Sequence, residues 1–100
     1  MSNRFLERFL YWIHKNPNLD ISQKDFYFGI LTDQFSKTEW DILFYYCSTS
    51  QGRRIRKIIE TYALMEKYHL DSVMMKIYQN GLLEGEKFAP SAFDSAIAFT

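Results

Sequence analysis

The fold is decided by residues 26–64, FYFGILTDQFSKTEWDILFYYCSTSQGRRIRKIIETYAL. Near the middle of this stretch, Ser36-Lys37-Thr38-Glu39 has the pattern of a capping box. In such a box the serine hydroxyl accepts from the backbone of the glutamate, and the glutamate side chain reaches back to the backbone of the serine. A helix therefore begins at Ser36. We expect Phe35 and Trp40 to pack across its start as a hydrophobic staple.

The helix that begins at Ser36 extends to about Cys47 and is apolar nearly all round. Its side chains at helical spacing are Trp40, Leu43, Phe44 and Cys47. The remaining surface carries Ile42, Tyr45 and Tyr46. A helix with this pattern lies at the centre of a bundle or in an interface, because none of its sides favours water.

Helices are also predicted on both sides of this one. The preceding helix starts at Ser22, with Asp25 as its capping partner. Its predicted buried face consists of Phe26, Tyr27, Ile30, Leu31 and Phe35. Residues 48–52 form a loop. The inward side chains of the helix after that loop are Ile55, Ile58, Ile59, Tyr62 and Ala63.

The two ends of the chain are helical in pattern as well. Over residues 3–15 the apolar stripe consists of Leu6, Phe9, Leu10 and Ile13, widened by Phe5 and Trp12. Asn16-Pro17-Asn18 ends that helix, because proline cannot continue the hydrogen-bond ladder. A further helix is predicted over residues 71–79, followed by an irregular stretch at 82–90. Ser91 with Asp94 starts a last short helix that buries Ala92, Phe93, Ala96 and Ile97.

These elements predict an all-α protein, a compact bundle of five to six short helices. One hundred residues give a single domain, 1–100, with a workable but thin core. The start of the chain has no signal-peptide pattern, and the apolar run from Ile42 to Cys47 is too short to cross a bilayer. A single cysteine fits a reducing compartment. We therefore expect a cytoplasmic protein without a membrane span.

The composition favours a protein partner over nucleic acid. The net charge is zero, whereas general adhesion to nucleic acid needs a positive excess, so nucleic-acid binding is possible but not favoured. Nine Phe, seven Tyr and two Trp are more aromatic residues than a fold of this size can enclose. We expect some of them to contact a protein partner or a second copy in an oligomer. The expected contributors are Tyr11, Trp12, Tyr45, Tyr46 and Tyr78.

The inventory of reactive residues predicts no cofactor and no metal site. One cysteine and two histidines, His14 and His69, have no paired ligand spacing, and the four glycines form no phosphate loop. Cys47 lies on an apolar helical face, which predicts a buried and unreactive thiol.

Arg8 and His14, separated by five residues, form the one candidate catalytic pair. The spacing resembles the R-x(4–6)-H element of the HEPN ribonucleases, in which the two residues act on the scissile phosphate. The other interpretation is that Arg8 is a surface charge and that His14 interacts with the dipole at the end of its helix. The first interpretation would make the protein a small metal-independent ribonuclease.

Arg53, Arg54, Arg56 and Lys57 form the only cluster of charge. Four cations at a helix N-terminus oppose the helix dipole. That local cost indicates a role in binding a phosphate or an acidic partner. The alternative is a solvated basic face paired with Glu60 and neighbouring acidic residues.

Two blocks of the chain follow a recurring pattern, Y-x-x-I-L-x-x-Q-L-S-x-x-E-L-x-L-L-F-Y-N and then F-K-x-L-I-E-K-Y-x-L-L. The first block matches at Tyr27, Ile30, Leu31, Gln34, Phe35, Ser36, Glu39, Ile42, Leu43, Phe44 and Tyr45. The second matches at Arg56, Lys57, Ile58, Ile59, Glu60, Tyr62 and Leu64, and upstream Arg8, Leu10, Tyr11 and Ile13 resemble F-R-x-L-Y-R-I. The chain from about residue 5 to residue 70 thus resembles the PutAbiC-type family of bacterial phage abortive infection proteins. Residues 71–100 would be a C-terminal helical extension.

The resemblance implies phage defence but supplies no established reaction or catalytic residues. Members of the family generally carry N-terminal membrane helices, so this chain looks like the cytoplasmic domain alone or a stand-alone relative. We favour a non-enzymatic interaction or sensor module in anti-phage defence that acts through protein–protein contacts. The alternative is the ribonuclease that uses Arg8 and His14. The expected binding residues are Arg53, Arg54, Arg56, Lys57, Tyr45 and Tyr46.

Overall fold

The computed structural model describes residues 3–68 and 88–99, and the elements in these ranges are all helical. The α-helices are α1 (Asn3–Lys15), α2 (Ile21–Thr32), α3 (Lys37–Cys47), α4 (Arg53–Tyr62) and α6 (Ser95–Ala98). Two 3-10 helices, η1 (Ser50–Gly52) and η2 (Pro90–Ala92), connect them. The prediction of an all-α fold is confirmed. None of the helices in the described ranges is long and apolar enough to span a bilayer.

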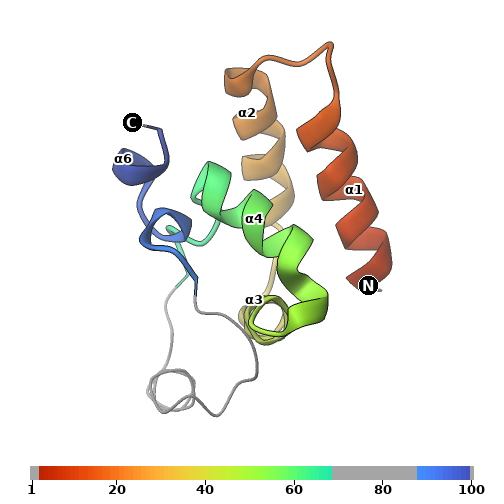
Figure 1. Cartoon of the computed structure of the whole chain (residues 1–100), viewed down its shortest axis with the longest axis vertical. Helices are drawn as coiled ribbons and strands as arrows, with labels where there is room; N and C mark the ends of the chain where they lie inside the picture. The colour runs from red at the N-terminus through yellow and green to blue at the C-terminus, as the bar shows by residue number, and fades with distance from the viewer. Residues whose placement is uncertain (1–2, 69–87, 100) are drawn as a thin grey trace.

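The helices form a hairpin crossed by α4 (Figure 1). α1 and α2 lie side by side and run in opposite directions, and α4 packs across them. α3 is seen end-on in this view and is followed by η1 and α4. The segment of η2 and α6 packs on α4, and just after the end of α4 the Met65 amide donates to the Ala92 carbonyl over 3.0 Å.

The start of α3 has the predicted geometry. The Glu39 amide donates to the Ser36 hydroxyl over 3.1 Å, and the Ser36 amide donates to the Glu39 carboxylate over 3.2 Å. The rings of Phe35 and Trp40 pack across this cap, with centroids 5.1 Å apart. Leu43, Phe44 and Cys47 are buried and Trp40 is partly buried, as the apolar spacing predicts.

The predicted start of α2 is wrong by two residues. Asp20, not Ser22, is the N-cap, and its carboxylate accepts from the Gln23 amide over 2.8 Å. The Gln23 side chain accepts from the Asp20 amide over 3.0 Å, which completes the box. Asp25 therefore has no capping role. Asp20-x-x-Gln23 fits the same capping pattern as Ser22-x-x-Asp25 and has the longer amide side chain that reaches back to the cap.

The predicted buried face of α2 is also wrong. Phe28, which was not on that face, is fully buried against Tyr62, with ring centroids 4.6 Å apart. Of the five predicted residues, Leu31 and Phe35 are partly buried and the other three, Phe26, Tyr27 and Ile30, are exposed. The same holds for three residues of the α1 stripe, since Phe5, Phe9 and Trp12 are exposed whereas Leu6, Leu10 and Ile13 are buried. Both helices are apolar on two faces, and only one face of each meets the core.

Glycine is required where α3 turns into α4. Gly52 is buried, and a Cβ atom there would lie 2.3 Å from the Tyr46 carbonyl oxygen and 2.6 Å from the Cys47 Cα atom. The loop predicted at 48–52 contains the short helix η1. All five residues predicted to point inward after this turn are buried: Ile55, Ile58, Ile59, Tyr62 and Ala63.

The last helix begins later than predicted. Asp94, not Ser91, is its N-cap, and the Asp94 carboxylate accepts from the Ala96 amide over 3.0 Å. Ser91 lies inside η2. Ala92 is buried and Phe93 is partly buried, as predicted, whereas Ala96 and Ile97 are exposed. The helix predicted at 71–79, Tyr78 and most of the irregular stretch at 82–90 lie outside the described residues.

Candidate interaction surface

An apolar groove of about 410 Å³ lies between α1 and α2. The residues that line it are Phe9, Trp12, Ile13, Asn16, Leu19, Tyr27, Ile30, Leu31 and Gln34. Seven of the nine are apolar or aromatic, the other two are amides, and none is charged. Ile13 belongs to the buried core and Leu31 packs against that core. The floor of the groove is therefore formed by residues that are continuous with the core.

The groove is flanked by large side chains that remain exposed. On α1, the rings of Phe5, Phe9 and Trp12 follow one another with successive centroids 6.4 Å apart. On α2, Tyr27 and Ile30 line the groove and Phe26 contacts the Tyr27 ring at 5.9 Å. We call these six residues the hairpin face: Phe5, Phe9, Trp12, Phe26, Tyr27 and Ile30. Contiguous exposed apolar patches of this kind mark binding sites in soluble proteins.

The tyrosines predicted to bind a partner lie elsewhere, on α3. Tyr45 is exposed. Tyr46 is partly buried, and its hydroxyl donates to the Glu7 carboxylate over 3.4 Å and to the Gln51 carbonyl over 3.3 Å. Burial, together with the negative charge of Glu7, raises the pKa of Tyr46. Tyr46 therefore has a structural role between α1 and η1, and of this pair Tyr45 has the greater exposed surface.

Of the four residues in the predicted basic cluster, Arg56 is buried. Its guanidinium donates from Nη1 to the Cys47 carbonyl over 3.1 Å. That carbonyl belongs to the last turn of α3, where a cation is favoured by the helix dipole. Arg56 therefore joins α3 to α4 and is not part of an outer surface. Arg53, Arg54 and Lys57 remain exposed, and the Arg54 guanidinium lies 5.7 Å from the centre of the Tyr11 ring.

Arg8 and His14 occupy different environments. Arg8 is exposed and lines a shallow surface depression with Tyr11, Trp12 and Lys15. His14 faces α4, where its Nδ1 atom lies 2.9 Å from the Tyr62 hydroxyl oxygen. Residues six apart on an α-helix differ by about 120° in direction, so these two side chains diverge. Catalysis by the pair stays a prediction, which an RNA cleavage assay with a His14→Ala variant would test.

The His14–Tyr62 contact joins α1 to α4. Burial lowers the pKa of His14, and the positive charges of Lys15 and Lys24 lower it further. Burial and the negative charge of Asp25 raise the pKa of Tyr62. Both shifts favour a neutral imidazole and a protonated phenol, and the tautomer of the imidazole decides which of the two atoms donates in this contact. Sequence reasoning missed this contact because the two residues are far apart in the chain.

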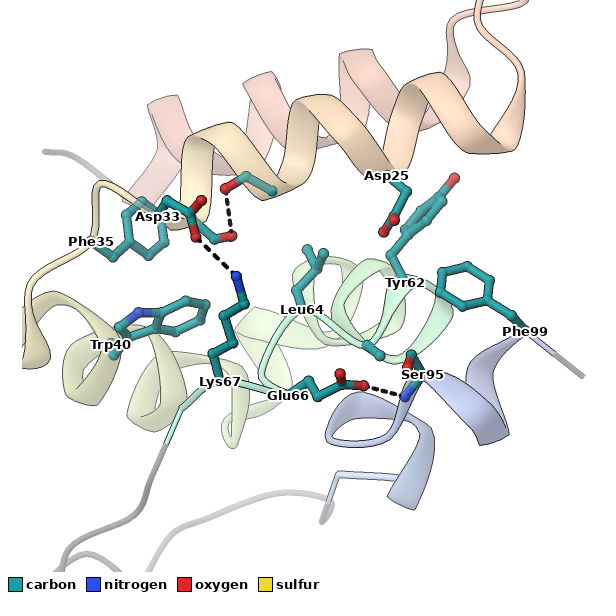
Figure 2. Close-up of a pocket in the computed structure, with 13 residues that line it drawn as sticks. Asp25, Asp33, Phe35, Trp40, Tyr62, Leu64, Glu66, Lys67, Ser95 and Phe99 are labelled. Carbon is teal, nitrogen blue, oxygen red and sulfur yellow. Dashed lines mark hydrogen bonds and ion pairs between the residues drawn. The ribbon is translucent and has the colours of Figure 1, made fainter.

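A second cavity, of about 420 Å³, lies between α2, the end of α4 and the C-terminal segment (Figure 2). Phe35 and Trp40 stand at one end of it, and Asp25, Tyr62 and Phe99 stand at the other. Two other carboxylates on its wall have partners within the fold. Asp33 pairs with Lys67 at 3.5 Å, and Glu66 accepts from the Ser95 amide. These two carboxylates are thus already paired with other segments of the fold.

Cys47 is fully buried in the core. Burial strongly raises the pKa of its thiol, so the thiolate is not available as a nucleophile near neutral pH. No group of three or more His, Cys, Asp or Glu side chains placed to hold a metal ion occurs within residues 3–68 and 88–99. Within the described residues, the groove and the hairpin face are therefore the stronger candidate for a functional site than any reactive or metal-binding group.

Comparison with known families identifies the chain further. Residues 4–73 match the family model described as "Putative phage abortive infection protein". Because the match covers well over half of the chain, the protein belongs to this family, which supports a role in phage abortive infection. The matched range contains α1 except for its first residue, all of α2 to α4 and the whole hairpin face. No significant match was found among curated proteins or among solved structures.

Proposed function

We propose that the protein acts in phage abortive infection as a non-enzymatic interaction module, and that the hairpin face is its contact surface. The observation that carries this proposal is the exposure of six large apolar side chains around one uncharged groove. Each is between 40% and 64% exposed. Keeping this much apolar surface in water is unfavourable by about 25 cal/mol per Å², and a bound protein would remove that cost.

The composition of the hairpin face supports a protein as its ligand. Interface cores are enriched in aromatic residues and depleted of charged ones, and five of the six residues are aromatic. Trp and Tyr are also the residue types that contribute most to binding when they are fully desolvated. Trp12 on α1 and Tyr27 on α2, which both line the groove, are therefore the expected centre of the contact.

Tyr45, Arg53, Arg54 and Lys57 form a second, smaller candidate surface. An acidic partner bound there would dissociate as salt is raised, because exposed charges are screened over about 8 Å at physiological ionic strength. The double variant Arg53→Glu with Arg54→Glu tests this surface independently of the hairpin face. It changes charge on α4 and leaves the groove between α1 and α2 intact.

The test is phage protection in a bacterial host that expresses the protein. We expect the double variant Trp12→Ser with Tyr27→Ser to lose protection, measured as efficiency of plating, because its groove no longer has an apolar centre. The matched control is Ile21→Ser with Ile42→Ser. It removes two exposed apolar side chains, at 64% and 53% exposure, that do not line the groove.

Both variants should keep the helical circular dichroism and the thermal midpoint of the wild type, since all four residues are exposed. Full protection by the groove variant, or equal loss of protection in the control, would overturn the assignment of the hairpin face. Loss of protection in Arg53→Glu with Arg54→Glu alone would move the contact to the second surface.

A further inference from the structure

We propose that the occupant of the hairpin face is a second copy of this chain, so that two α1–α2 hairpins pack face to face as a four-helix bundle. This inference rests on the proposed function, because it names the partner of the same surface. Three properties of the hairpin face carry it: its area, its lack of charge and the geometry of the two helices.

The exposed area matches what a dimer requires. A whole aromatic side chain buries about 150–250 Å², so the exposed parts of the six hairpin-face residues offer on the order of 600 Å². A stable protein–protein interface buries about 800 Å² on each partner. These side chains alone therefore provide most of one side of a standard interface. The groove-lining Leu19 and Gln34 add to it.

The charge distribution permits self-association. In a two-fold dimer the same patch supplies both sides of the interface, so any charge at its centre would face a like charge. No charged residue lines the groove, and the whole chain has twelve basic and twelve acidic residues. Two copies therefore bring no like charges together at the centre of the groove, and Arg8 and Lys15, which line a neighbouring depression with Trp12, lie at its edge.

The lengths and the antiparallel arrangement of α1 and α2 suit packing against the same two helices of a second copy. α1 has 13 residues and α2 has 12, which makes both about 18–20 Å long. They run antiparallel as neighbours (Figure 1), which is half of an up-and-down four-helix bundle. The row of Phe5, Phe9 and Trp12 forms a ridge along α1 beside the groove. In a face-to-face pair, the ridge of each copy enters the groove of the other.

The experiment is light scattering on the purified full chain across about 1–100 µM, a range in which interfaces of this size can dissociate. We expect the wild-type mass to approach twice the 12.0 kDa of one chain as concentration rises. Trp12→Glu should stay at the mass of one chain, because it places a like charge on both sides of the interface. Ile21→Glu, equally exposed but outside the groove, should dimerise like the wild type.

Should Trp12→Glu fail to show wild-type circular dichroism, Phe5→Glu replaces it. That side chain is as exposed as Trp12 and lies in the first turn of α1, where an acid favours the helix. A wild-type mass of one chain at every concentration would overturn the inference. So would a dimer that persists in both Trp12→Glu and Phe5→Glu.

The two proposals fail in different ways. Wild-type chains that stay monomeric while Trp12→Ser with Tyr27→Ser loses phage protection would overturn the dimer and support a different protein as the occupant. A wild-type dimer whose groove variants become monomeric but still protect the host would support the dimer and overturn the proposed function.

Discussion

At the scale of single residues, Gly52 allows the start of α4 to approach the backbone of α3 closely. The backbone of Tyr46 and Cys47 occupies the space that a side chain would need. We predict that Gly52→Ala destabilises the protein by about 1–3 kcal/mol, the range measured when a well-packed site is overfilled. Urea unfolding followed by circular dichroism measures this change.

Gly29 provides the matched control, since it lies inside α2 and an added Cβ would meet nothing within 4 Å. Gly29→Ala should stabilise the protein by about 0.5–1 kcal/mol, because alanine is the better helix former. If Gly52→Ala were as stable as Gly29→Ala, the close approach of α3 to Gly52 would be contradicted.

His14 makes stability depend on pH. Its pKa in the folded chain lies below the ordinary value of 6.5, so near that pH the unfolded chain binds a proton that the folded chain does not. We predict that the free energy of unfolding falls as pH drops below about 6.5 and stops falling on this account below the folded pKa.

Thermal midpoints of the wild type and of His14→Asn, measured from pH 7.5 down to pH 5, test the effect of this residue. The wild type should lose more stability than the variant over that interval, because asparagine does not titrate. Parallel pH profiles for the two proteins would rule out His14 as the cause.

The residue scale also shows what local patterns can predict. The box from Ser36 to Glu39 was predictable because all its partners lie within four residues of sequence. The burial of Arg56 was not predictable, because its acceptor is the backbone of a different helix. Local sequence indicates charge, whereas only the packing of α3 on α4 decides whether that charge meets water.

At the scale of elements, the inward faces of α3 and α4 were predicted correctly from the sequence, and α3 offers the sharper test. Leu43 is 3% exposed and Ile42, its neighbour, is 53% exposed. We predict that Leu43→Ala costs about 2–5 kcal/mol through loss of burial and the cavity left behind. Ile42→Ala should change stability by no more than about 0.5 kcal/mol. Chemical denaturation of the two variants compares them, and equal losses would contradict the orientation of α3.

α1 and α2 show why the candidate site could be predicted only in part. The surplus of aromatic residues correctly indicated exposed rings, and Tyr11 and Trp12 were among those expected. Phe26, Tyr27 and Ile30 were assigned to the core because periodicity identifies an apolar face without saying what it faces. Phe28 meets Tyr62 of α4, and this long-range contact turns the other apolar face of α2 outward.

At the scale of the whole molecule, the core and the hairpin face lie on different sides of the same two helices. One side of α1 and α2 is covered by α4, and the groove opens on a side that no described element covers. The family match spans this entire unit. We infer that the hairpin is both the support for α4 and the surface through which the protein acts.

Hydroxyl-radical footprinting reports directly whether the hairpin face is covered when the protein works. Trp12 and Tyr27 on this face, and Tyr45 on α3, are all exposed in the single chain and all react with the radical. Their oxidation can be compared between dilute purified protein and cells that the protein protects from phage. We predict that Trp12 and Tyr27 become protected in cells while Tyr45 reacts as before. Unchanged oxidation of Trp12 and Tyr27, with protection only at Tyr45, would contradict the hairpin face as the contact surface.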